Sequence, residues 1–358
     1  MRITAPSLAV LAALLACTGA AAAEAPAIGV AAPLSGASAL LGRQVAAGAR
    51  VAAGTSGLRL VTADDACTGD GGAQAARQFA EEKVDIVVGF LCMEAIEAAL
   101  PVLKEAGIPV VTVGVRTDSL TDRRDKTGWP VFRLAPRGDA ERGAVAAMLT
   151  KAWRDDLFAI VDDGTIYGRE LAESFRAAAA QAALKPVFTD TYRPELDNQI
   201  GLIGRLKKAG ATHVLAGGDG EDVAIMARDA QKLDAGMVFA GGEALRAPPG
   251  PVPYAAGTLM IALPEWADVA HREALDAFAA ARVRPEGYAL PAFAAVEIAR
   301  AASSAAESSG RPLAQELTGR DFATAIGPIR FDAKGDLAQN PYRMFRFDGA
   351  RFIPMEGQ

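Results

Sequence analysis

The chain has 358 residues, of which 51% are apolar and 22% charged, the balance of an ordinary globular protein and not of a disordered one. Its net charge is −6, its pI is near 5.2 and it has no basic tract, so we expect no nucleic-acid partner. This length exceeds a single typical hydrophobic core, and two domains are expected.

Residues 1–23 predict export from the cytoplasm. Arg2 is the only charge, 8–16 is an apolar core, and three alanines at 21–23 provide a small-residue cleavage site. This layout is that of a secretory signal peptide, and it is too short for a membrane span. Cys17 follows a stretch similar to a lipoprotein box, so lipid anchoring through Cys17 is the less favoured alternative. We expect a periplasmic protein.

Strands and helices alternate along the rest of the chain. The expected strands are nearly continuous apolar runs, as in parallel sheets that are covered on both faces. Helices are expected between them, and Gly107 and Gly210 are typical helix C-caps. The pattern predicts an α/β protein with five strands before Pro136 and about five after Asp156. The strands are expected at 27–34, 58–63, 85–90, 109–115, 131–136, 157–163, 186–192, 212–218, 237–242 and 257–263. Helices between them are expected at 72–82, 94–107, 168–184, 198–210 and 220–233, among others.

Cys67 and Cys92 follow two consecutive predicted strands. A strand, helix, strand unit allows those strands to lie side by side, with both carboxyl ends on one edge of the sheet. In an oxidising compartment this arrangement favours a disulfide, and two separate buried thiols are the alternative. Because open parallel sheets bind ligands at their carboxyl edge, the disulfide is expected to brace a ligand-facing loop.

The order of several short motifs resembles a known family, the periplasmic branched-chain amino-acid-binding proteins of ABC importers. The motifs are "APLSGASALLG" (32–42), "DDAC" (64–67), "VGFLC" (88–92), "GIPVVTVG" (107–114), "DDGTIYGRE" (162–170), "GGE" (241–243) and "IGPIRFDAKGDL" (326–337). The resemblance implies two doubly wound parallel-sheet lobes joined by a three-segment hinge. Lobe 1 is then 24–135 plus 266–341, and lobe 2 is 136–265 plus 342–358. The family's disulfide falls on the same cysteine pair.

The resemblance also implies ligand-binding positions. Glu243 keeps the acidic residue that holds a ligand ammonium group, and Tyr167 keeps an aromatic residue of lobe 2. Met93 and Arg116 stand where the family has the hydroxyl residues that hold a carboxylate. Because a guanidinium group grips a carboxylate through two N–H bonds, Arg116 is expected to replace that clamp.

Two further positions of the family's site carry different residue types here. Leu41 and Asp219 stand where the family has aromatic residues, so the ligand need not be leucine. Leu41 and Met93 leave room for an apolar body, which favours an apolar amino acid. If Asp219 enters the cleft beside Glu243, a more cationic or hydroxylated ligand is the alternative. The alternatives are structural roles: an Arg116–Asp118 surface pair, a Met93 that fills an apolar wall, a packed Tyr167 and solvated carboxylates at Glu243 and Asp219.

The expected function is the extracytoplasmic solute-binding subunit of an ABC importer, a monomer that docks on a permease in the inner membrane. The alternatives are a ligand-sensing receptor of the same fold, or an importer subunit for an amide or an aliphatic or aromatic carboxylate. An enzyme is not expected, since the sequence lacks GxGxxG, GxxxxGK[ST], HExxH and GxSxG motifs. No cofactor or metal is expected: His213 and His271 are isolated, and the acidic stretch around Asp65 lacks the spacing of an EF-hand.

Overall fold

The computed structural model of the protein describes residues 26–355, so the expected signal peptide and Cys17 lie outside the described residues. All ten predicted strands are present, and the α/β prediction is confirmed. The strands are β1 (Ala27–Ala32), β2 (Arg59–Asp64), β3 (Ile86–Gly89), β4 (Val110–Thr112), β5 (Val131–Arg133), β6 (Phe158–Asp162), β7 (Phe188–Thr191), β8 (His213–Gly217), β9 (Val238–Gly241) and β10 (Leu259–Ala262).

Strands β1 to β5 form a parallel sheet in the order β2-β1-β3-β4-β5. Alternate residues of β1 face opposite cores: Ile28 and Val30 pack with helices α1 and α12, and Ala27 and Ala31 pack with α2 and α3. Because both faces are buried, the strand residues are apolar almost throughout. The other elements of this unit are α1 (Ala39–Ser56), α2 (Gly69–Glu81), α3 (Met93–Glu105), α4 (Ser119–Asp122), α5 (Arg124–Thr127), α10 (Trp266–Val269), α11 (Arg272–Ala280), α12 (Ala289–Ser309), α13 (Leu313–Leu317), β11 (Asp321–Thr324) and β12 (Gly327–Arg330).

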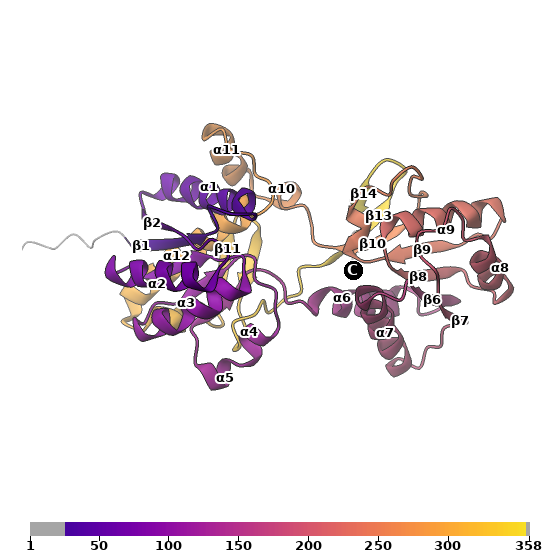
Figure 1. The fold of residues 1–358 in the computed structure, drawn as a ribbon, viewed down its shortest axis with the longest axis horizontal. Coiled ribbons are helices and arrows are strands. Elements are labelled where there is room, and N and C mark those ends of the chain that lie inside the picture. The colour runs from indigo at the N-terminus through magenta and orange to yellow at the C-terminus, as the bar shows by residue number, and fades with distance from the viewer. Residues whose placement is uncertain (1–25, 356–358) are drawn as a thin grey trace, which may run out of the picture.

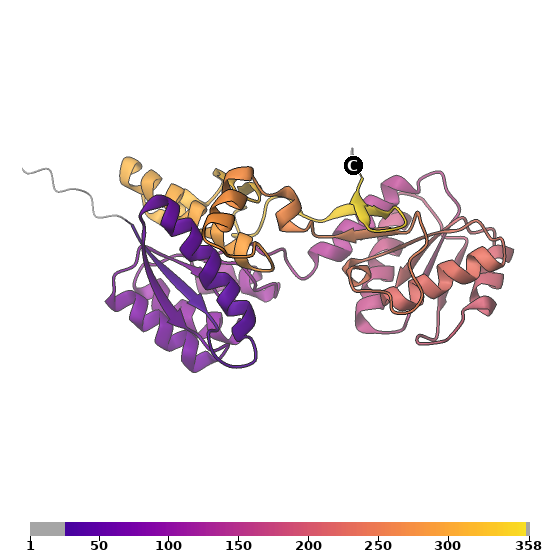
Figure 2. The same ribbon diagram turned by 90° about the horizontal axis from the view of Figure 1, so that it is seen from above.

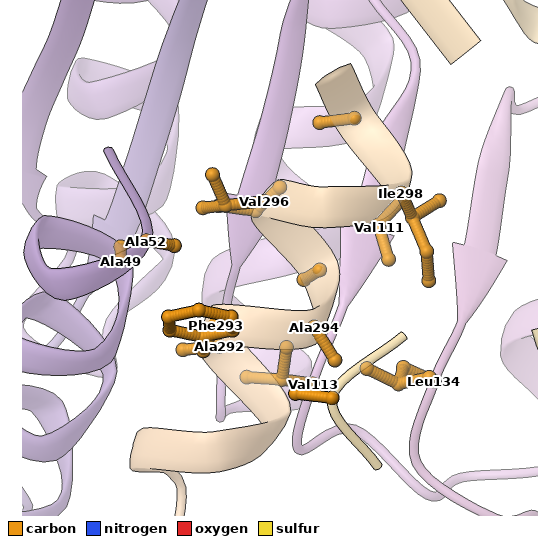
Figure 3. Close-up of a cluster of buried hydrophobic side chains, with 14 of the residues drawn as sticks. Ala49, Ala52, Val111, Val113, Leu134, Ala292, Phe293, Ala294, Val296 and Ile298 are labelled. Carbon is orange, nitrogen blue, oxygen red and sulfur yellow. The ribbon is translucent and has the colours of Figure 1, made fainter. Parts of the chain in front are cut away.

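Helix α12 is a distant segment of the chain that returns to the core of the first sheet. Figure 3 shows its Phe293 and Val296 near Ala49 of α1, and its Ile298 near Val111 of β4. The approach of α1 and α12 is close because Gly48 has no side chain: a Cβ there would stand 1.9 Å from the Ala289 carbonyl oxygen. Residues far apart in the chain therefore complete one core.

The second sheet has the order β14-β13-β10-β9-β8-β6-β7. Strands β6 to β10 are parallel, and β13 (Arg343–Phe347) and β14 (Phe352–Pro354) extend the sheet as antiparallel strands beyond β10. This antiparallel edge is not among the predicted strands. The helices of this unit are α6 (Ala140–Ala152), α7 (Ile166–Gln181), α8 (Ile200–Lys208), α9 (Gly220–Lys232) and the 3₁₀ turn η1 (Glu243–Arg246).

The chain passes between the two sheets three times: after β5, after β10 and after β12. Figure 1 and Figure 2 show two separate α/β bodies joined by these segments. We call the body around β1 to β5 the first lobe and the body around β6 to β10 the second lobe. A site between the lobes is therefore built from residues that are far apart in sequence.

The predicted disulfide between Cys67 and Cys92 is confirmed, and their Cα atoms lie 5.2 Å apart. The expected adjacency of their strands is wrong, because β1 lies between β2 and β3. The loop after β2 bends over the end of β1 instead: the Asp65 N–H donates to the Ala32 carbonyl at 3.1 Å, and Cys67 has a φ of 54°. The loop thereby reaches across the central strand to the end of β3.

Candidate ligand-binding site

A cavity of about 360 Å³ lies where the connecting segments meet both lobes. This volume is within the usual range of small-molecule sites, which are mostly apolar with a few polar groups. The apolar and aromatic part of the wall comprises Val113, Leu134, Leu263, Pro264, Trp266, Tyr288, Pro291 and Ile326. The charged side chains of the wall are Arg116, Glu243, Arg246, Glu265 and Glu286.

Two of the predicted site residues, Arg116 and Glu243, meet at this cavity from opposite lobes. Arg116 follows β4 of the first lobe, and Glu243 opens η1 after β9 of the second lobe. The Arg116 guanidinium lies 3.5 Å from Glu243 Oε2, and the Tyr342 hydroxyl donates to the same oxygen at 3.0 Å. Asp118 pairs with Arg137 instead, so the alternative Arg116–Asp118 ion pair is not formed. A cation and an anion from different lobes thus face one cavity.

Glu243 is held in place by two side chains of its own lobe. Glu141, in the first turn of α6, accepts a hydrogen bond from the Tyr167 hydroxyl at 2.7 Å and another from the Glu243 N–H at 2.7 Å. The Ala244 N–H donates to the Tyr167 hydroxyl at 3.4 Å. Gly242 makes room for this group, since a Cβ there would stand 2.2 Å from the Glu141 carboxylate. The turn after β9 is therefore fixed before any ligand arrives.

Burial and charge set the protonation of these groups. Burial raises the pKa of Glu141 above its ordinary value, and the neighbouring Glu243 carboxylate adds to this effect. Burial also raises the pKa values of Tyr167 and Tyr342, so both phenols stay protonated and act as donors. Burial alone would lower the pKa of Arg116, but Tyr342 and Glu243 outweigh it and raise the pKa.

The other four predicted site residues do not line this cavity. Tyr167 lies behind Glu243, where its hydroxyl bonds Glu141 and Ala244. Met93 is the first residue of α3 and packs against the core beside α2 and α3. Leu41 lies in the first turn of α1 and is 40% exposed. Asp219 is the N-cap residue of α9 and is exposed. That these residues contact the ligand stays a prediction, and it concerns the closed arrangement of the two lobes.

Several residues of the site carry no sequence signal that identifies them. Glu141 lies within an ordinary helical pattern, and Tyr342 precedes an antiparallel strand that the sequence does not predict. Trp266 and Tyr288 come from segments around α10 and before α12 that reach the cavity only through the second crossing. These contacts depend on how the two lobes are placed, which local patterns do not encode.

Within residues 26–355, no group of three His, Cys, Asp or Glu side chains is arranged to hold a metal ion. His213 packs against Trp153 at 5.3 Å between ring centroids, and burial lowers the pKa of His213.

Within residues 26–355, no helix has the length and apolar character required to cross a bilayer.

Comparison with known proteins agrees with this architecture. The sequence profile described as "Periplasmic binding protein" matches residues 26–351. A relative from Brucella melitensis, "Leu/Ile/Val-binding protein homolog 3", is 31% identical over 351 residues, which cover 92% of this chain and 93% of that protein.

Solved structures show the same fold. A putative branched-chain amino acid ABC transporter from Rhodospirillum rubrum matches 93% of this chain and 100% of its own, with a TM-score of 0.76 at 19% identity. An ABC transporter substrate-binding protein from Desulfitobacterium hafniense, in complex with Leu, matches 93% of this chain and 100% of its own, with a TM-score of 0.65 at 22% identity. At these identities the likeness concerns the fold alone.

Proposed function

The chain belongs to the periplasmic binding protein family, and from this premise we propose that it is the extracytoplasmic solute-binding subunit of an ABC importer. The solute is a small amino acid or a similar molecule, as the names of the Brucella and Desulfitobacterium proteins suggest. The protein delivers it to a permease in the inner membrane as a monomer, and releases it chemically unchanged.

The observation that carries this proposal is the opposite charge of Arg116 and Glu243 across one cavity. A zwitterionic amino acid presents a carboxylate and an ammonium group on one carbon. Arg116 would take the carboxylate and Glu243 the ammonium group, so that the solute replaces their direct ion pair. The apolar wall around Trp266 and Tyr288 would exclude water from both contacts.

Binding of this kind couples to closure of the two lobes. A solute stabilises the closed form only by its higher affinity for that form, and contacts to both lobes provide the difference. We propose lobe boundaries at 24–135 plus 266–341 and at 136–265 plus 342–358, so that 136, 265 and 342 mark the hinge. On closure, Leu41, Met93 and Asp219 would join Arg116, Glu243 and Tyr167 around the solute.

A thermal-shift screen of the mature protein tests the proposal. The panel holds the standard amino acids, amides, and aliphatic and aromatic carboxylates. A solute at 100 times its dissociation constant should add about 2.7 kcal/mol to the free energy of unfolding. Stabilisation by an amino acid that is recovered intact supports the proposal, whereas stabilisation by none of the panel, or chemical conversion of the solute, contradicts it.

A further inference from the structure

The hydroxyl group of Tyr192, just after β7, is buried without a hydrogen-bond partner among the described residues. Tyr192 is 4% exposed, and its ring packs in the core beneath α8 and α9. Its hydroxyl lies against Gly218 at the end of β8: a Cβ on Gly218 would stand 2.1 Å from this oxygen and 3.1 Å from Asp163 Oδ2. A buried hydroxyl normally has a partner, and this one has none in the described protein, so it is free to bond a ligand group.

Carboxylates lie near this hydroxyl at the carboxyl edge of the second sheet, and after burial their charges are the main reason that the pKa of Tyr192 is raised. Asp163 follows β6, Asp219 caps α9, and Asp222 lies in the first turn of α9. None of the three has a Lys, Arg or His partner at ion-pair distance within residues 26–355. Burial, together with the charges of Asp219 and Asp163, raises the pKa of Asp222 to about 6. These carboxylates therefore repel one another, and no cationic side chain of the described residues offsets their charge.

These surroundings select the chemistry of a ligand group that could bind here. A metal ion does not fit, since no three of these side chains converge at coordination distance within the described range. An anion would be repelled by the three carboxylates. An organic cation fits, because an ammonium or guanidinium group donates hydrogen bonds to carboxylates and to a phenolic oxygen together.

The position of the cluster relates it to the candidate site. Strand β8 lies beside β9, which Glu243 follows, and β6 lies beside β8. Neighbouring strands are about 4.8 Å apart, so the ends of β8 and β6 lie roughly 5 and 10 Å from the end of β9. An amino acid held by its ammonium group at Glu243 would reach Asp219 and Asp163 with a side chain of four or five bonds.

We propose that Asp163, Asp219, Asp222 and Tyr192 form a subsite for the cationic side chain of a basic amino acid. The inference rests on the proposed function and adds to it the class of solute. Asp163 and Asp219 provide the charge, and the Tyr192 hydroxyl accepts from the cation. Asp222, whose Oδ1 accepts from the Glu195 N–H at 3.1 Å, shapes the floor of the subsite.

Lysine and norleucine test this subsite, because they differ only in the terminal ammonium group. In isothermal titration, the mature protein should bind lysine at least about tenfold more tightly than norleucine. A tenfold ratio is about what one hydrogen bond to a charged group contributes at the low end of its usual range. Asp163→Asn keeps the acceptor that bonds Thr165 and removes only the charge, and it should abolish most of this preference. Tyr192→Phe should reduce the preference by a few fold without changing norleucine binding.

Asp155→Asn is the matched control, since Asp155 is an exposed carboxylate before β6, at the opposite edge of the same sheet. It should leave the ratio of the two affinities unchanged. Norleucine or leucine binding as tightly as lysine would overturn the subsite and leave the proposed function standing. A lysine preference that survives in Asp163→Asn and Tyr192→Phe would also overturn it. Binding of no amino acid would overturn both proposals.

Discussion

Replacement of Arg116 by alanine separates a role in binding from a role in folding. The Arg116 and Glu243 side chains are 42% and 25% exposed, and their charged atoms lie 3.5 Å apart. A pair this open to water contributes about 0–1 kcal/mol to folding. For a protein of this size, 1 kcal/mol changes the melting temperature by about 2–4 °C. The ligand-free Arg116→Ala variant should therefore melt within a few degrees of the parent.

The expected effect on binding is larger, because closure removes water from the contact. A hydrogen bond to a charged group contributes about 1.5–3 kcal/mol when its partner is lost. The Arg116→Ala variant should therefore bind its amino acid about 10 to 150 times more weakly. Arg116→Lys keeps the charge but not the two parallel N–H groups, and it should fall between the parent and the alanine variant.

The assay pairs isothermal titration with a melting curve for each variant. Arg123→Ala is the control: Arg123 lies in the same lobe, is half-exposed and pairs with Glu97 away from the cavity. It removes the same charge and should leave the dissociation constant unchanged. An unchanged dissociation constant in Arg116→Ala would refute the carboxylate clamp. A melting temperature more than about 5 °C lower would assign Arg116 to folding instead.

Two further predictions concern the first lobe. The Cys67–Cys92 disulfide closes a loop with a sequence separation of 25, so Cys67→Ser with Cys92→Ser should lower the free energy of unfolding by about 3 kcal/mol in urea titrations; equal midpoints for parent and variant would contradict this. Burial raises the pKa of Asp65 to about 6, and its Oδ2 has no partner among the described residues. Because the pKa is raised, the protonated Asp65 side chain favours folding at low pH, and this contribution is lost as the pH rises through about 6. Asparagine has no charge to bury, so Asp65→Asn should stabilise the protein by about 2 kcal/mol at pH 8 and not at pH 4. Equal stabilisation at both values would show that charge is not the cause.

The sequence predicts the parallel strands of this fold well, because a strand that is buried on both faces is a continuous run of apolar residues. Strands such as β1 and β3 are almost wholly apolar. Strand β13 lies between β14 and β10, and two buried apolar residues, Met344 and Phe345, stand between two arginines. The third crossing brings β13 beside β10. Short antiparallel strands of this kind leave a weaker pattern.

The order of strands and the assembly of the site are less visible in sequence. Local patterns place the cysteines on neighbouring strands, but the insertion of β1 between β2 and β3 is a property of the whole sheet. Arg116 and Glu243 are 127 positions apart, and their contact depends on the placement of two lobes. Only the resemblance to a family suggests both residues, and Glu141 and Tyr342, which hold Glu243, have no such support.

The central claim is that a solute closes the two lobes around Arg116 and Glu243. Small-angle scattering of the mature protein, with and without a saturating amino acid from the screen, measures this directly. The radius of gyration should fall on binding in the parent, since the two lobes are separate bodies joined by the connecting segments. An unchanged radius of gyration in a sample that calorimetry shows to be saturated would contradict the account.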